Sequence, residues 1–283
     1  MTQDDRAGLT LAAIAVFFFS TSPIFIRWAE PLSAFQISCG RLVVGAAAIL
    51  ILARIRGELV RPARRDWLRF AGYGAITAAH FAFYVGAVLH TTIAHALTIV
   101  YSAPIFVAIF SAWLLKEPLA WRRYLGIGVA IVGLGILVGF EPNLTREMLI
   151  GDLMALGSAI TFALYSIFGR SERKRYPLFT YAGVVYGAAA LWLLPFAVAT
   201  TTFMPQWPQV LSIIGLGLIP MAAGHTLYNA AVRKTHAAYA NLIATQEATG
   251  GVILGILLLA EVPGPAALAG LGITIGGIVL VLL

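Results

Sequence analysis

The chain has 283 residues, of which 60% are hydrophobic and only 11% charged, and its mean hydropathy is +0.89. A water-soluble protein is closer to half apolar and a quarter charged, because one core cannot bury this much apolar surface. The composition therefore excludes a soluble globular protein and indicates a polytopic membrane protein. The net charge of +7 would favour nucleic acid as a partner of a soluble protein, but in a membrane protein it reports topology, so we expect no nucleic-acid partner.

Ten apolar runs are long enough to cross the membrane, since a helix needs about 20 residues to span about 30 Å of hydrocarbon. The N-terminal segment is acidic, and the first run is full length without a small-residue cleavage site, so we expect a retained first span and no signal peptide. The predicted spans cover residues 7–26, 31–53, 70–89, 94–115, 122–140, 151–169, 176–199, 209–232, 236–260 and 263–283.

The placement of Lys and Arg predicts the orientation of these spans. Sixteen of the nineteen lie on the N-terminal segment and the even-numbered connections, whereas Arg27 and Arg146 lie on the opposite side and Arg41 lies inside the second span. Because cytoplasmic loops carry an excess of positive charge, both termini are predicted to be cytoplasmic.

The two halves of the sequence are related by an internal repeat. A shift of 144 residues lays residues 96–138 over 240–282, Tyr84 over Tyr228 and Thr91 over Thr235; a shift of 143 lays Phe19 over Phe162 and Arg27 over Arg170. We therefore predict an N-terminal repeat of residues 1–147 and a C-terminal repeat of residues 148–283. Since each half holds five spans, the second is inverted relative to the first.

Inverted repeats favour a transporter, because two related halves can pack in two near-equivalent ways, each open to one side of the membrane. This arrangement is the structural basis of alternating access. The alternative is that the duplication serves only the stability of the fold.

Each half also ends its fourth span with the pattern Leu-Leu-x-Glu, at residues 114–117 and 258–261, before a glycine-rich fifth span. With the inverted five-plus-five layout, this pattern resembles the drug/metabolite transporter superfamily, EamA type, over essentially the whole chain. The resemblance implies an all-α fold of ten transmembrane helices, with four helices of each half around a central cavity and the fifth and tenth helices outside. It also implies a secondary transporter that exports small organic metabolites. Within the family the chain is similar to bacterial amino-acid exporters, including those for aromatic amino acids.

Two charged residues, Arg41 and Glu247, lie near the middle of predicted spans. A formal charge inside the bilayer is energetically expensive, so such residues are usually paired or functional. Two alternatives remain open. Arg41 and Glu247 pair and fix the second helix against the ninth, or they line the cavity, where Arg41 suits a carboxylate and Glu247 an ammonium.

Two histidines at similar depth in the third and eighth spans, His80 and His225, each have a tyrosine on the same helical face, Tyr84 and Tyr228. They either line a shared cavity or are packing residues with hydrogen bonds. Aromatic faces with a few polar groups suit a small organic molecule with an apolar side chain. Further candidate substrate-binding residues, on helices that the resemblance places around the cavity, are Ser22, Thr98, Tyr101, Tyr165, Asn229, Asn241 and Thr245.

We predict no catalytic residue, cofactor or metal site. Ser158 and His225 are the nearest approach to a serine-protease pair but lack the Gly-x-Ser-Gly context, and a P-loop is absent. Gly126-x-Gly128 and its repeat at 270–272 fit close helix packing. The expected partners are a small-molecule substrate and the lipid bilayer; proton coupling and the oligomeric state are left open. The alternatives are a drug or nucleotide-sugar carrier of the same fold, and a membrane-embedded enzyme.

Overall fold

The computed structural model describes residues 2–138, 145–172, 174–260 and 265–282, and within these ranges every regular element is helical. The elements in chain order are α1 (Gln3–Phe19), α2 (Ser22–Trp28), α3 (Ala34–Ile55), η1 (Arg64–Asp66), α4 (Trp67–His90), α5 (Ile93–Val100), α6 (Ala103–Phe110), η2 (Ser111–Leu115), α7 (Trp121–Val138), α8 (Arg146–Ser171), α9 (Leu178–Ala199), α10 (Trp207–Leu216), η3 (Gly217–His225), α11 (Thr226–Lys234), α12 (Ala237–Ala244), α13 (Glu247–Leu259) and α14 (Pro265–Leu282).

These helices confirm the predicted all-α fold of ten transmembrane segments. Eight helical segments are long and apolar enough to cross a membrane, and α7 and α14, of 18 residues each, complete the layout. The observed ends lie within a few residues of the predicted ones. Some predicted residues lie outside the described ones: 139–140 of the fifth span, 263–264 and 283 of the tenth span, and Glu261 of the second Leu-Leu-x-Glu pattern.

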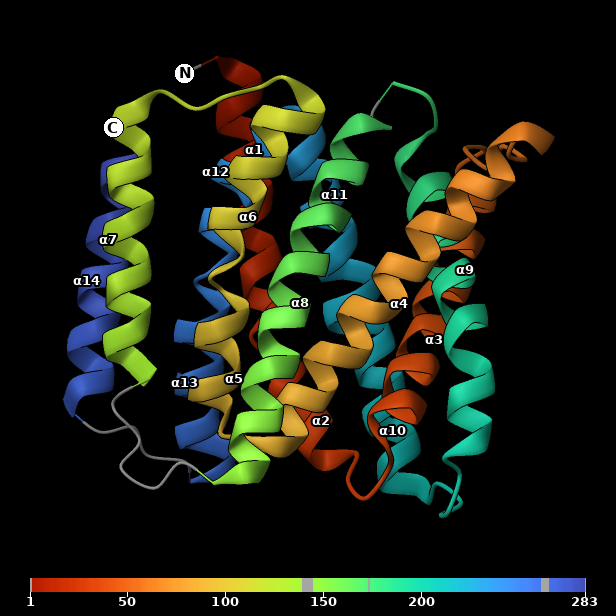
Figure 1. Ribbon diagram of the computed structural model, residues 1–283. Helices are drawn as coiled ribbons and strands as arrows, with labels where there is room; N and C mark the ends of the chain where they lie inside the picture. The colour runs from red at the N-terminus through yellow and green to blue at the C-terminus, as the bar shows by residue number, and fades with distance from the viewer. Residues whose placement is uncertain (1, 139–144, 173, 261–264, 283) are drawn as a thin grey trace.

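The second half of the chain runs in the opposite direction through the bundle. In Figure 1, α1 begins at the end where both termini lie, whereas α8 begins at the opposite end. Helices α7 and α14 lie side by side at one edge of the bundle, as the family resemblance implied. They pack closely because Gly126 has no side chain: a Cβ there would lie 2.6 Å from Cγ2 of Val281.

The repeat is also visible in individual contacts. Arg27 Nη2 donates to the carbonyl oxygen of Thr91 at 3.0 Å, and Arg170 Nη1 donates to the carbonyl oxygen of Thr235. Arg27 and Arg170 are equivalent in the repeat, as are Thr91 and Thr235. In each half, an arginine at the end of the first span thus binds the carbonyl that ends the third span. The boundary between residues 147 and 148 stays a prediction.

Four spans are interrupted inside the bundle. The first breaks between α1 and α2, the eighth changes to a π-helix over η3, and the fourth and ninth break at residues 101–102 and 245–246. The last two breaks are equivalent in the repeat. They form although Pro104 in the fourth span corresponds to Ala248 in the ninth, so this proline alone does not cause the break. Interrupted helices are tolerated at membrane depth where they line a cavity.

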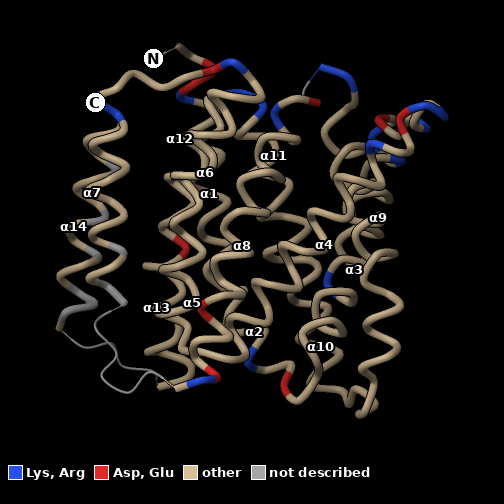
Figure 2. Tube along the Cα trace, viewed as in Figure 1, with Lys and Arg blue, Asp and Glu red and all other residues tan. Residues whose placement is uncertain are grey.

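The charged residues are distributed as the sequence predicted. Figure 2 shows most Lys and Arg at the end of the bundle that carries both termini, with few at the other end. Among described residues, the exceptions inside the bundle include Arg41 of α3 and Glu247 of α13, which are 1% and 5% exposed. These two buried charges direct attention to the centre of the fold.

Candidate functional site

A closed pocket lies among the interrupted helices at the centre of the bundle. It leaves about 10 Å³ of free space, about enough for one water molecule. Both halves of the chain contribute to it, whereas α7 and α14 contribute none of its described side chains. The lining residues are Phe19, Ser22, Arg41, His80, Phe81, Tyr84, Val100, Tyr101, Phe162, His225 and Glu247.

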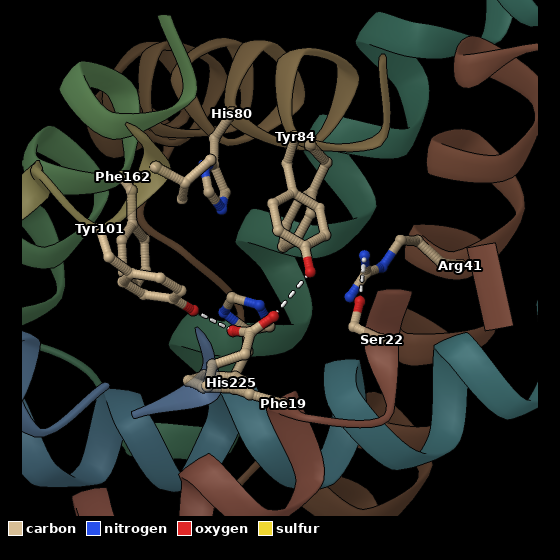
Figure 3. Close-up of a pocket in the computed structure, with 11 residues that line it drawn as sticks. Phe19, Ser22, Arg41, His80, Tyr84, Tyr101, Phe162 and His225 are labelled. Carbon is tan, nitrogen blue, oxygen red and sulfur yellow. Dashed lines mark hydrogen bonds between the residues drawn. The ribbon is translucent and has the colours of Figure 1, made fainter. Parts of the chain in front are cut away.

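Glu247 joins the two halves of the chain across the pocket. It is the first residue of α13, directly after the break in the ninth span. One carboxylate oxygen accepts a hydrogen bond of 2.6 Å from the Tyr84 hydroxyl, and the other accepts one from the Tyr101 hydroxyl, as Figure 3 shows. Because both tyrosines belong to the first half, these bonds link the two halves of the chain at the pocket.

Arg41 faces the same pocket with its own neighbours. Its Nη1 donates to the Ser22 hydroxyl at 3.3 Å, and its guanidinium lies 4.5 Å from the centre of the Phe81 ring. Its Nε is buried without a hydrogen-bond partner. Among the ion pairs within 4 Å that join described residues, none links Arg41 to Glu247. The pocket thus holds two opposite charges that do not neutralise each other directly.

The two histidines meet on the aromatic wall of the pocket, with ring centroids 6.3 Å apart. His80 Nδ1 lies 3.0 Å from the Ser158 hydroxyl, whereas His225 Nδ1 is buried without a partner in the described part of the chain. The Phe19 and Phe81 rings lie 4.5 and 4.9 Å from His225. The wall therefore offers flat apolar faces and one unused nitrogen.

The structure brings seven of the predicted site residues together in the pocket: Ser22, Arg41, His80, Tyr84, Tyr101, His225 and Glu247. Tyr165 lies directly beside it, with its ring 5.8 Å from His225 and its hydroxyl 2.6 Å from Asn229 Nδ2. Tyr228 lies behind the Phe162 ring, 5.2 Å away. The role of each residue in binding stays a prediction.

The remaining predicted site residues bond elsewhere. The Tyr228 hydroxyl lies 2.7 Å from the Ser166 hydroxyl and accepts from Asn241 Nδ2 at 3.1 Å. The hydroxyls of Thr98 and Thr245 donate to carbonyls one turn earlier in their own segments. None of these four residues lines the pocket, although all are buried.

Four lining residues were not among the predicted site residues: Phe19, Phe81, Val100 and Phe162. Two of them, Phe19 and Phe162, occupy equivalent positions in the repeat. That equivalence is the sequence signal that could have identified them. Within the described ranges, no group of three or more His, Cys, Asp or Glu residues could hold a metal ion. The arrangement presents one acid, one guanidinium and several aromatic rings to the same small space.

The inverted fold and the charged central pocket define a multi-pass membrane transporter. The chain belongs to the EamA-like transporter family, whose model matches twice, over residues 6–139 and 149–283. It is 25% identical over 271 residues to a probable terminal-alkyne amino-acid exporter of Streptantibioticus cattleyicolor, covering 90% of each chain. It is also 24% identical over 234 residues to an aromatic amino acid exporter of Ancylobacter novellus, covering 81% of each.

The fold has a counterpart among solved structures. A crystal structure with 19% sequence identity superposes with a TM-score of 0.80 and covers 97% of this chain and 96% of the other. This chain is 25% identical over 272 residues to an uncharacterized transporter of Bacillus subtilis. The alignment covers 95% of this chain and 91% of that transporter. The likeness therefore extends over both halves.

Proposed function

We propose that this transporter exports amino acids with apolar or aromatic side chains across the bacterial inner membrane. The observation that carries the proposal is that Arg41 and Glu247 share one aromatic pocket without pairing with each other. A zwitterionic amino acid supplies a carboxylate for Arg41 and an ammonium for Glu247. The names of two relatives, an aromatic amino acid exporter and a probable terminal-alkyne amino-acid exporter, support the same class of substrate.

The aromatic wall accounts for the side chain of the substrate. The rings of Phe19, Phe81 and Phe162 offer apolar surface, and a pocket with apolar walls and few polar groups fixes orientation through those polar groups. A polar or charged side chain would lose its hydration there without gaining a partner. We therefore expect Phe, Tyr, Leu and similar residues to be preferred over Asp or Lys.

Transport proceeds by alternating access between the two repeats. In the closed pocket, the Glu247 carboxylate is held by the hydroxyls of Tyr84 and Tyr101 from the other repeat. The ammonium of an entering amino acid competes with these hydroxyls for the carboxylate. Substrate binding therefore loosens a contact that keeps the repeats together.

A flux assay in proteoliposomes tests this function. The purified protein is reconstituted into proteoliposomes. Separate samples are loaded with each of the twenty amino acids, a nucleotide sugar or a cationic drug, and counterflow of the radiolabelled solute is measured. We expect counterflow of amino acids with large apolar side chains, lost in Arg41→Gln and Glu247→Gln but kept in Arg54→Gln, a charge on the exposed end of α3. Counterflow of the nucleotide sugar or the drug alone would contradict the proposal.

A further inference from the structure

A second pair of opposite charges lies near the Lys- and Arg-rich end of the bundle. Glu172 follows the last residue of α8 and is 5% exposed. Its Oε1 accepts a hydrogen bond of 2.7 Å from the Tyr73 hydroxyl, but its Oε2 is buried without a partner. A buried carboxylate oxygen without a hydrogen bond is unfavourable, so this atom calls for an explanation.

Arg233, near the end of α11, has buried hydrogen-bond donors without partners. Its Nη1 donates to the carbonyl oxygen of Tyr176 at 3.0 Å, whereas its Nε and Nη2 are buried without partners. Within the described part of the chain, Arg233 forms no ion pair within 4 Å. Glu172 forms one with Arg175, whose Nη1 lies 3.8 Å from Glu172 Oε1. The two unpartnered groups therefore do not satisfy each other.

Arg233 lies against the buried ring of Tyr181, and Tyr73, the hydrogen-bond partner of Glu172, lies near the same ring. The Arg233 guanidinium lies 5.2 Å from its centroid, and the ring of Tyr73, which binds Glu172, lies 6.4 Å from it. The Tyr181 hydroxyl is itself buried without a partner. The rings of Phe168 and Phe70 pack against Tyr73 at 4.7 and 6.1 Å. Like the central pocket, this second set of residues combines one acid, one guanidinium and aromatic rings.

A row of polar groups connects this region to the central pocket. Asn229 lies one turn before Arg233 on α11, on the same face of the helix. Its Nδ2 donates to the hydroxyls of Tyr165 and Tyr186 at 2.6 and 3.2 Å. The Tyr165 ring in turn lies 6.4 Å from the His80 ring of the pocket wall. Hydrogen-bonding groups thus lie between Arg233 and the pocket wall.

We propose that Glu172 and Arg233 form an outer binding site that receives the ammonium and the carboxylate of an amino acid between the Lys- and Arg-rich end and the central pocket. The inference rests on the proposed function. A zwitterion fits because it supplies a charged donor for Glu172 Oε2 and a charged acceptor for Arg233 Nε and Nη2 without adding net charge. In this structure Tyr176, whose carbonyl oxygen accepts from Arg233, also donates its hydroxyl to Asp66 at 2.7 Å.

Uptake measured from each side of the membrane tests the outer site. Inside-out vesicles present the Lys- and Arg-rich end to the medium, and right-side-out vesicles present the other end. We expect Glu172→Gln and Arg233→Gln to raise the KM for radiolabelled L-phenylalanine by about tenfold or more in inside-out vesicles, since hydrogen bonds to charged groups are the stronger ones. In right-side-out vesicles the KM should change less than about twofold.

Analogues lacking one charge separate binding from a purely structural role. Phenethylamine has no carboxylate, so Arg233→Gln should leave its inhibition of phenylalanine uptake unchanged. 3-Phenylpropionate has no ammonium, so Glu172→Gln should leave its inhibition unchanged. Residues that only hold the closed end together would change the maximal rate for every solute alike, and that result would overturn the outer site.

Matched controls and a second variant keep the test decisive. Arg64→Gln and Arg122→Gln remove exposed charges at the same end, away from Glu172 and its ion-pair partner, and should leave both KM values unchanged. If Arg233→Gln does not fold, judged by size exclusion in detergent, Arg233→Lys should show the same one-sided rise in KM. If the wild type takes up phenylalanine and the Glu172 and Arg233 variants keep its KM in inside-out vesicles, only the outer site is contradicted. Wild-type vesicles that take up none of the twenty amino acids contradict the proposed function and the outer site with it.

Discussion

Arg41 and Glu247 bring opposite charges into one buried pocket, yet each is held by other neighbours. The guanidinium of Arg41 contacts Ser22 and the Phe81 ring. The carboxylate of Glu247 accepts hydrogen bonds from Tyr84 and Tyr101. Since burying a charge without a counter-ion is costly, the arrangement supports the proposed binding of a ligand that brings both opposite charges.

The first prediction concerns the stability of variants at these two positions. Breaking a buried ion pair costs about 3–5 kcal/mol, and removing both partners recovers much of that loss. Because Arg41 and Glu247 have separate partners, Arg41→Gln and Glu247→Gln should each cost less than this. Their effects should add to within about 1 kcal/mol in the double variant. Equilibrium unfolding in mixed micelles measures both quantities, and recovery of stability in the double variant would indicate a direct pair instead.

The second prediction separates the two histidines. His80→Leu should lower stability by about 1 kcal/mol, because it removes the hydrogen bond with Ser158. His225→Leu should lower it less, since Nδ1 of His225 has no partner among the described residues. Both should alter the order of preference among amino acids in the flux assay.

Ser158→Ala is the control for His80, because it removes the Ser158 hydroxyl but keeps the Ser158 carbonyl oxygen, which lies 3.2 Å from His80 Nδ1. It should lower stability no more than His80→Leu, measured by thermal unfolding in detergent, and keep the wild-type preference for substrates. Equal loss of stability in both histidine variants would argue that His225 also has a structural partner.

The spans and their ends could be predicted from sequence, because the thickness of the bilayer sets the length of each apolar run. The interruptions could not. The fourth predicted span, 94–115, has no Asp, Glu, Lys or Arg on either side of Tyr101 and Ser102, so its apolar run continues across the break. Only the repeat relates this break to the one at 245–246.

The site was predicted in part for similar reasons. Arg41, Glu247 and the two histidines stand out because charged and titratable groups are rare inside a membrane. Phe19 and Phe162 do not stand out, because aromatic residues occur throughout the spans. Thr98 and Thr245 were expected to line the cavity, but a threonine hydroxyl can bond to its own helix. Sequence does not distinguish these two uses.

The third prediction concerns the packing of α7 against α14. Gly126→Val should destabilise the protein by about 1–3 kcal/mol, because its side chain would overlap Val281. Gly128, two residues later, has no atom within 4 Å of a built Cβ, so Gly128→Val should change stability by less than about 0.5 kcal/mol. Thermal unfolding in detergent compares the two. Equal effects would mean that the two helices pack differently.

The fourth prediction concerns orientation in the membrane. Tags inserted at residues 200–209 or 141–147 should be accessible from outside intact cells, and tags at 54–69 or 170–175 should be protected. The reason is the excess of Lys and Arg at the end of the bundle that carries both termini. Antibody labelling before and after permeabilisation measures accessibility. Labelling of 54–69 in intact cells would reverse the proposed direction of export.

Calorimetric binding to the detergent-solubilised protein tests the central claim most directly, with L-phenylalanine, phenethylamine and 3-phenylpropionate as ligands. If Arg41 and Glu247 bind the two charges of one amino acid, the wild type should bind phenylalanine about tenfold or more tightly than either analogue. Arg41→Gln should then bind phenylalanine and phenethylamine about equally, and Glu247→Gln should bind phenylalanine and 3-phenylpropionate about equally. Equal affinity of the wild type for all three ligands would contradict the claim.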